Sequence, residues 1–353
     1  MVDDAEERIN NLTDRQTDRQ TDRQTDRQTE QYYVVDWLKL IAAVCVIIIH
    51  TCREKLTQEY YGNYGIDLLN FMVSLAVPFF FCVSGYFLYK RIDQTKAREN
   101  ILKTSVRKYF KLYLIFSAVY LPISVYAWLG EFYRGDGILK IGIRALKNYI
   151  LVGEQSYSWP LWYLLAMIYG LIVLLISKDD NKSMIVESVI FFLVAIILNR
   201  FSSIKIIAWF LGSGRLFTAP AYLLIGGLVY KNRGKFEKYS EIGIMLSCAG
   251  ILTSLVLHLN YSTASIPAYI SIPWILCWSM KFKGISKTAL IARKVSSIFY
   301  YSHMYFYFIW LFTGNAFSRF EESRDSGMGA FGFTFGICIL LSAIILGVKR
   351  QRK

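Results

Sequence analysis

The sequence has few of the residues, and lacks several of the motifs, that soluble enzymes commonly use for catalysis. Its 353 residues include only three histidines, and neither a His-Glu-x-x-His zinc motif nor a P-loop occurs. The six cysteines form no Cys-x-x-Cys pair. Most of them lie inside apolar runs, where cysteine behaves as a small hydrophobic residue. These absences exclude the zinc-protease and P-loop nucleotidase classes, and we expect no bound metal or cofactor.

Apolar residues are plentiful instead. The chain is 54% hydrophobic and 16% aromatic, with a mean hydropathy of +0.35, which is too apolar for a soluble domain of this length. Because long apolar runs recur along the chain, we expect an all-α, polytopic membrane protein. The formal net charge is +14. In a membrane protein such an excess mainly records which loops stay in the cytoplasm, so no nucleic-acid partner is expected.

Hydropathy predicts about ten transmembrane helices. They are roughly residues 34–52, 68–89, 109–129, 160–177, 184–201, 215–230, 240–258, 265–280, 297–314 and 330–348. With the N-terminus inside, the cytoplasmic segments between these spans carry about twice as many Lys and Arg residues as the opposite segments. The positive-inside rule therefore predicts that both termini are cytoplasmic in a multi-pass protein of the plasma membrane.

The N-terminal residues 1–31 form a low-complexity tail ahead of a predicted membrane domain at 32–353. Residues 13–28 repeat Thr-Asp-Arg-Gln four times without one apolar residue, so this segment has nothing to bury and we expect it to be disordered. Because the tail is polar, no cleavable signal peptide is expected either.

The four-residue period of the tail has a second explanation at the level of DNA. The four-base unit ACAG, read in triplets, encodes Thr, Asp, Arg and Gln in that order before the frame repeats. Slippage by one unit would shift the frame and switch expression off and on. We therefore hypothesise phase variation, with an ordinary low-complexity tail as the alternative.

The first predicted span carries three ionisable residues on one face. Asp36 and Lys39 lie near its start, and His50 follows Lys39 by eleven residues, a step that returns to nearly the same side of a helix. The rise between Lys39 and His50 is about 16 Å, around half the hydrocarbon thickness of a bilayer. Ionisable groups are costly there, so we interpret this face as functional. The alternative is that all three residues lie at the interfaces.

Two further segments could contribute to a binding site, one at the cytoplasmic side and one between helices. Arg107, Lys108 and Lys111 precede the third span and could hold the phosphates of a cytosolic donor or the headgroups of anionic lipids. Ser84 and Gly85, in the second span, allow close approach of a ligand or of a neighbouring helix.

Three residues elsewhere in the spans are candidates for contact with a substrate. Trp162 opens the fourth span and could stack on a sugar or belong to an aromatic belt. Arg215 adds a cation at the outer end of the sixth span, and His303 lies within the ninth. If protons are transferred in the membrane near neutral pH, His50 and His303 are the natural candidates.

Four segments, in order along the chain, resemble signatures of the acyltransferase 3 family of integral membrane acyltransferases. They are Asp36-x-Leu38-Lys39 with His50, Phe79-Phe80-Phe81-Cys82-Val83-Ser84-Gly85-Tyr86, Arg107-Lys108-Tyr109-Phe110-Lys111, and Tyr300-Tyr301-Ser302-His303. Lysine stands at Lys39, and again in the third segment, where the family usually has arginine. A lysine keeps the charge but loses the planar fork that binds phosphate with two hydrogen bonds.

The resemblance implies transfer of an acyl group, usually acetyl from acetyl-CoA, in a bacterial plasma membrane. The acceptor would be a hydroxyl of a surface polysaccharide, or of another envelope glycan or lipid-linked saccharide. It implies that His50 is catalytic, with Asp36 in the same signature. It also implies that Lys39, Arg107, Lys108 and Lys111 bind the acyl-CoA donor.

A second resemblance points to another class of function. The segment 212–220, with Gly226-Gly227, is similar to part of the membrane half of vancomycin-resistance serine racemases. It implies a membrane transport or binding module for a small molecule such as L-serine.

Overall fold

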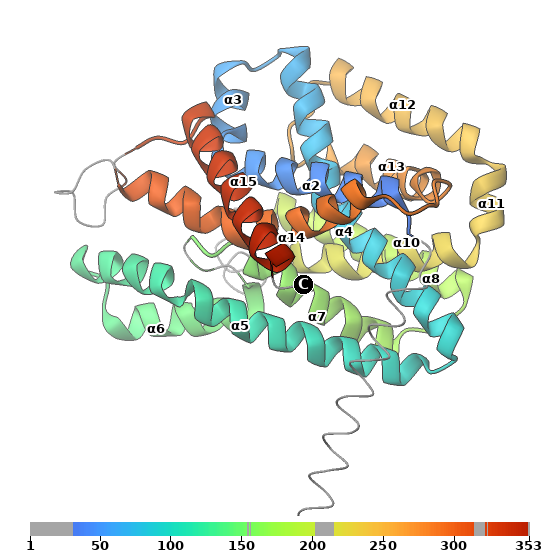
Figure 1. Cartoon of the computed structure of the whole chain (residues 1–353), viewed down its shortest axis with the longest axis horizontal. Coiled ribbons are helices and arrows are strands. Elements are labelled where there is room, and N and C mark those ends of the chain that lie inside the picture. Colours follow the sequence, from blue (N-terminus) through green and yellow to red (C-terminus); the bar gives the residue numbers. More distant parts are fainter. Residues whose placement is uncertain are drawn as a thin grey trace, which may run out of the picture.

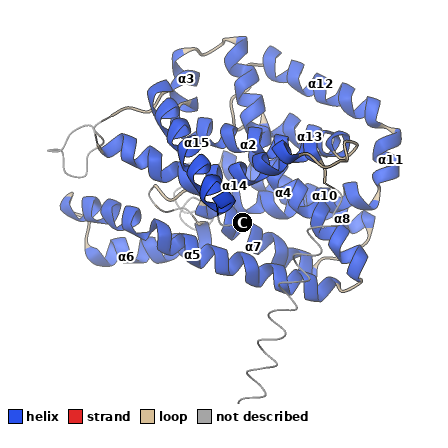
Figure 2. Cartoon of the chain, in the orientation of Figure 1, coloured by secondary structure: helices blue, strands red, loops and turns tan. Residues whose placement is uncertain are grey.

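The computed structural model of the chain describes residues 31–153, 155, 157–201, 215–313, 322 and 324–351, with side chains up to residue 348 (Figure 1). The Thr-Asp-Arg-Gln repeat, to which the disorder and slippage hypotheses apply, lies outside these residues. The described part is helical throughout, and its only extended pairing is a single bridge between Tyr32 and Lys283 (Figure 2). The predicted all-α class is therefore confirmed for these residues.

Thirteen α-helices make up this part of the chain, with a π-helical turn at Asn148–Val152 and a 3-10 turn at Arg215–Phe217. The helices are α2 (Tyr33–Thr51), α3 (Arg53–Glu59), α4 (Tyr64–Thr95), α5 (Arg98–Tyr133), α6 (Ile138–Lys147), α7 (Leu161–Ile176), α8 (Asn181–Arg200), α10 (Thr218–Lys231), α11 (Arg233–Lys238), α12 (Ser240–Val256), α13 (Ser265–Ser279), α14 (Lys287–Phe312) and α15 (Met328–Gln351).

Each of the ten predicted spans coincides with one of these helices. Five of the described helices, α2, α4, α5, α8 and α15, are long and apolar enough to cross a membrane. Helices α4, α5 and α14 extend well beyond the predicted boundaries, because hydropathy marks only the apolar part of a helix. The crossing of a membrane by all ten helices, and the cytoplasmic position of both termini, stay predictions.

The loops fall into two groups at opposite ends of the helices. At one end, the Tyr230 hydroxyl donates a hydrogen bond to Asp93 (2.9 Å). At the other end, the Gly327 amide donates to the Thr51 carbonyl (2.7 Å), and the His258 Nδ1 lies 2.7 Å from Asp67. Each of these three contacts joins helix ends that the predicted topology puts on the same side of the membrane.

Helix α2 lies in the middle of the molecule, between α4 and α14 (Figure 1). On the outside, helices α5, α8, α12 and α15 expose large apolar side chains, among them Leu114, Ile190, Met245 and Leu340. An apolar exterior around a core that contains ionisable residues is the arrangement expected of a helical protein in a bilayer.

Helices α4 and α10 touch through their backbones. A Cβ atom added at Gly85 would lie 2.2 Å from the Leu223 carbonyl oxygen, and one added at Gly226 would lie 2.0 Å from the Cys82 carbonyl oxygen. Small residues at such crossings let two membrane helices approach closely. The Ser84-Gly85 pair thus has a packing role through Gly85.

Candidate active site

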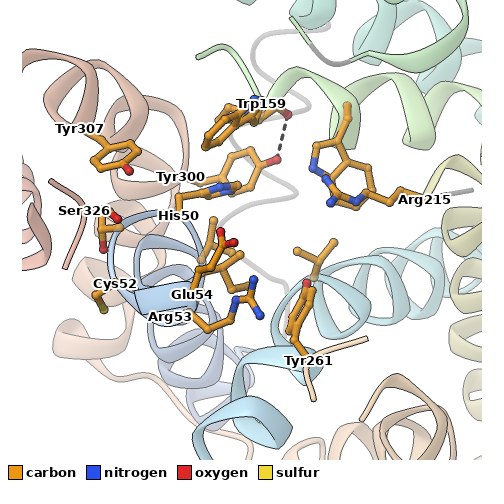
Figure 3. Close-up of a pocket in the computed structure, with 16 residues that line it drawn as sticks. His50, Cys52, Arg53, Glu54, Trp159, Arg215, Tyr261, Tyr300, Tyr307 and Ser326 are labelled. Carbon is orange, nitrogen blue, oxygen red and sulfur yellow. Dashed lines mark hydrogen bonds between the residues drawn. The ribbon is translucent and has the colours of Figure 1, made fainter. Parts of the chain in front are cut away.

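A cavity of about 340 Å³ opens at the C-terminal end of α2 and contains His50 (Figure 3). It falls within the range of about 300–1,000 Å³ that is usual for small-molecule sites. Its described lining residues come from seven separate parts of the chain. They are Val46, Ile49, His50, Thr51, Cys52, Arg53, Glu54, Val77, Trp159, Pro160, Trp162, Arg215, Tyr261, Tyr300, Tyr307 and Ser326.

The imidazole of His50 packs between two other rings. Its centroid lies 5.3 Å from that of Trp159 and 5.4 Å from that of His303, and the two imidazole planes are 26° apart. His50 therefore faces protein and the cavity, where a reacting group could reach it.

His303 is fully buried, and its hydrogen bonds determine which ring nitrogen carries the proton. Its Nδ1 lies 3.0 Å from the Phe299 carbonyl oxygen and 2.9 Å from that of Tyr300. Because carbonyl oxygens only accept, Nδ1 must be the donor, and Nε2 of the neutral ring is then an acceptor. This Nε2 is buried without a hydrogen-bond partner among the described atoms. Beside His50 there is thus an imidazole with an unused acceptor.

The two histidines meet because α2 and α14 run parallel and begin at the same level. The Gln31 side chain links these beginnings: its Nε2 donates to the Ser286 carbonyl (3.3 Å), and its Oε1 accepts from the Ser286 amide (3.0 Å). His50 and His303 lie at similar distances along their helices, about 25 Å from the start at 1.5 Å per residue. Their equal depth is therefore a property of helix register.

Aromatic residues hold the wall of the cavity opposite α2. The Tyr300 hydroxyl donates a hydrogen bond to the Pro160 carbonyl (3.0 Å), drawn as the dashed line in Figure 3. This bond ties α14 to the segment that begins α7 and carries Trp159 and Trp162. The wall against which His50 stacks is thereby anchored to the helix that carries His303.

Two arginines bring positive charge to the cavity. The Arg53 guanidinium lies 4.8 Å from the Tyr261 ring centroid, and that of Arg215 lies 6.0 Å from the Trp162 ring centroid. Glu54 is the one carboxylate among the described lining residues. The lining is therefore polar and cationic, with aromatic faces beside both cations.

Of the residues singled out in the sequence, the structure brings His50, Trp162 and Arg215 into the cavity and places His303 against His50. Arg53, Trp159, Tyr261 and Tyr300 were not singled out as site residues. The one signal that could have indicated Arg53 is its position three residues after His50.

The remaining candidates lie elsewhere, at the other end of the helices or between them. Asp36 is buried and accepts a hydrogen bond from the Gln31 side-chain Nε2 (3.2 Å), and the Lys39 Nζ lies 5.5 Å from the Phe87 ring centroid. The Ser84 hydroxyl donates to the Phe80 carbonyl (2.8 Å) within its own helix. Their roles, and a passage from Lys39 to His50, stay predictions.

Arg107, Lys108 and Lys111 are exposed along α5 and do not line the cavity. Donor binding by these three cations stays a prediction. In the part of the chain that the structure describes, no group of three or more His, Cys, Asp or Glu is placed to hold a metal ion.

Known proteins match most of the chain. Residues 32–347 match the acyltransferase 3 family, described as an acyltransferase domain. An amino-acid racemase of Enterococcus faecalis is 24% identical over 296 residues, which is 78% of this chain and 39% of that protein. A serine/alanine racemase of Enterococcus gallinarum is 29% identical over 143 residues, covering 40% of this chain and 19% of that protein. No solved structure matches the chain significantly.

The chain spans less than half the length of these curated relatives. The family match, in contrast, runs from just before α2 to the last turns of α15 and includes both histidines of the cavity region. Together with the apolar helices it indicates a membrane protein. On this match the chain belongs to the acyltransferase 3 family.

Proposed function

We propose that the protein transfers an acyl group, specifically acetyl, from cytosolic acetyl-CoA to a hydroxyl of a cell-envelope glycan or lipid-linked saccharide. The observation that carries this proposal is the position of His50, which lies in a ligand-sized cavity at the end of α2 opposite Lys39. Family membership supports the acyl-transfer chemistry. The cavity could hold the glycan hydroxyl that receives the acyl group, next to the His50 imidazole that takes its proton.

In this mechanism His50 acts as general base. It removes the proton of the acceptor hydroxyl as that oxygen attacks the thioester carbonyl. Collapse of the tetrahedral intermediate breaks the carbon–sulfur bond, and the protonated His50 returns its proton to the leaving thiolate, which gives free CoA and the acylated acceptor. The chain supplies proximity and proton transfer, and it needs no metal for either.

The donor would approach from the end of α2 that carries Lys39. CoA is strongly anionic at its nucleotide end, so a cationic vestibule favours it. We assign this role to Lys39 together with Arg107, Lys108 and Lys111. We assign Ser84 and His303 to contact with the substrate or to support of the site. Asp36, which lies on the same face of α2 as His50, is assigned a catalytic role with it.

Replacement of one histidine tests the proposal, with another histidine as the matched control. His50→Ala should abolish acetylation of surface polysaccharide, measured by mass spectrometry, at unchanged protein level in the membrane. The control is His258→Ala, because His258 is paired with Asp67 outside the cavity. Wild-type acetylation in His50→Ala cells would refute the proposal.

The relatives favour a second candidate function. They are named as racemases, one of them for serine and alanine, which supports transport or binding of an amino acid such as L-serine. Uptake of labelled L-serine by cells that express the chain, without acetylated glycan, would favour this alternative.

A further inference from the structure

The two arginines of the cavity line it together with the phenol of Tyr261. The Arg53 guanidinium packs over the Tyr261 ring at 4.8 Å, and Arg215 lines the same cavity from the turn before α10. Figure 3 shows the Arg53 guanidinium beside the Tyr261 ring and Arg215 reaching into the same cavity from a separate segment. Each guanidinium has five N–H donors in a rigid fork that suits a carboxylate or a phosphate.

The hydrogen bonding of Arg53 points to a ligand. Its Nε is buried and has no hydrogen-bond partner among the described atoms. A buried donor without a partner costs about 1–3 kcal/mol, so such groups usually have a partner when the site is occupied. Glu54, the one described carboxylate of the lining, offsets one of the two positive charges. The described lining therefore keeps a net positive charge next to His50.

We propose that Arg53 and Arg215 form an anion-binding subsite beside His50, which takes a phosphate group carried by the acceptor. The anion would sit between the two forks, and this would place a neighbouring hydroxyl of the same molecule near the imidazole. The identification of the anion with the acceptor rests on the proposed acyl transfer. The binding of an anion at the two arginines does not depend on that proposal.

A second cavity adjoins the first and bears on the source of the anion. It has a volume of about 220 Å³ and shares the wall residues Val77, Trp162, Arg215 and Tyr261 with the cavity that contains His50. On its far side, α8 contributes mainly apolar residues, among them Ala195. A phosphate on a lipid could thus place its head at Arg215 and part of its chain in this side cavity. A water-soluble phosphate would use the arginines alone.

Binding is tested on the purified full chain in detergent, without any acyl donor, by calorimetry. The probes are farnesyl phosphate and glucose 1-phosphate, with farnesol and glucose as their uncharged counterparts. We expect the phosphates to bind, and Arg53→Gln and Arg215→Gln each to weaken binding about tenfold or more. Arg53→Lys and Arg215→Lys keep the charge and are less prone to unfold the protein than the glutamine variants. They should bind the phosphates with intermediate affinity.

The matched control is Arg324→Gln, because Arg324 packs on Trp310 at 4.7 Å outside this cavity. It should bind both phosphates as the unmodified chain does. If farnesyl phosphate binds more tightly than glucose 1-phosphate and Ala195→Trp removes the difference, the anion comes on a lipid. If both phosphates bind equally, the anion is water-soluble. Either pattern supports the subsite.

The subsite is refuted if the glutamine variants bind as the unmodified chain does, if neither phosphate binds, or if L-serine binds and phosphate does not. Phosphate binding in a chain that transfers no acyl group would leave the subsite standing and remove the proposed function. Acyl transfer in a chain that binds no phosphate would leave the proposed function standing and remove the subsite.

Discussion

The contact between α4 and α10 allows a quantitative prediction about one methyl group. In Gly226→Ala, the new Cβ would lie 2.0 Å from the Cys82 carbonyl oxygen and 2.7 Å from the Tyr86 amide nitrogen. Both atoms belong to the backbone of α4, so no side chain can turn away. Since real contacts of this kind stay above about 3 Å, the two helices must separate by about 1 Å, and overpacking of this kind costs about 1–3 kcal/mol.

The assay is thermal unfolding in detergent, followed by circular dichroism. The control makes the same chemical change where space is open: a Cβ at Gly336, on α15, has no atom within 4 Å. Alanine there should be neutral or stabilising by up to about 1 kcal/mol, because glycine in a helix interior is unfavourable. We expect Gly226→Ala to melt several degrees below Gly336→Ala.

The same variant should also impair the site. Helix α4 contributes Val77 to the cavity wall, and Arg215 precedes the first turn of α10. A separation of the two helices changes the distance between these side chains, so acyl transfer should fall more than the loss of folded protein explains. Equal melting temperatures for Gly226→Ala and Gly336→Ala would refute the backbone contact.

Three further changes test the arrangement of the site. Tyr300→Phe removes the 3.0 Å hydrogen bond to the Pro160 carbonyl, which still accepts one from the Tyr163 amide (3.3 Å). The change should cost about 0.5–1.5 kcal/mol in unfolding free energy and lower the turnover of acyl transfer, and a wild-type turnover would count against an anchoring role. Gln31→Ala removes two bonds to Ser286 and should raise hydrogen exchange at the start of α14, and unchanged exchange would contradict this. Lys39→Gln should raise the KM for acyl-CoA about tenfold and leave turnover at saturation largely intact, whereas an unchanged KM would remove Lys39 from donor binding.

The positions of the helices could be predicted from apolar runs alone. Apolar runs such as residues 40–49 recur along the chain, and each of the ten predicted spans coincides with a helix. The ends were less predictable: α14 begins at Lys287, ten residues before the predicted span, because its first turns are polar and are held by Ser286 as N-cap. Hydropathy cannot detect a helix that continues outside the apolar layer.

The candidate site was predictable only in part. His50 was identifiable because an imidazole is rare within an apolar run. Arg53 begins α3 and Tyr261 lies in a turn, both outside the predicted spans, and the only sequence signal for either is the position of Arg53 three residues after His50. Only their cation–π contact in the folded chain marks them as members of the same cavity.

The sequence by itself determined the helical class and the depth of each histidine along its own helix. These follow from local properties, namely hydropathy and a rise of 1.5 Å per residue. Tertiary structure alone decided that the two imidazoles stack at 5.4 Å, because this requires α2 and α14 to pack in parallel and in register. That register depends on contacts such as those between Gln31 and Ser286, 255 positions apart in the chain, and no local pattern encodes them.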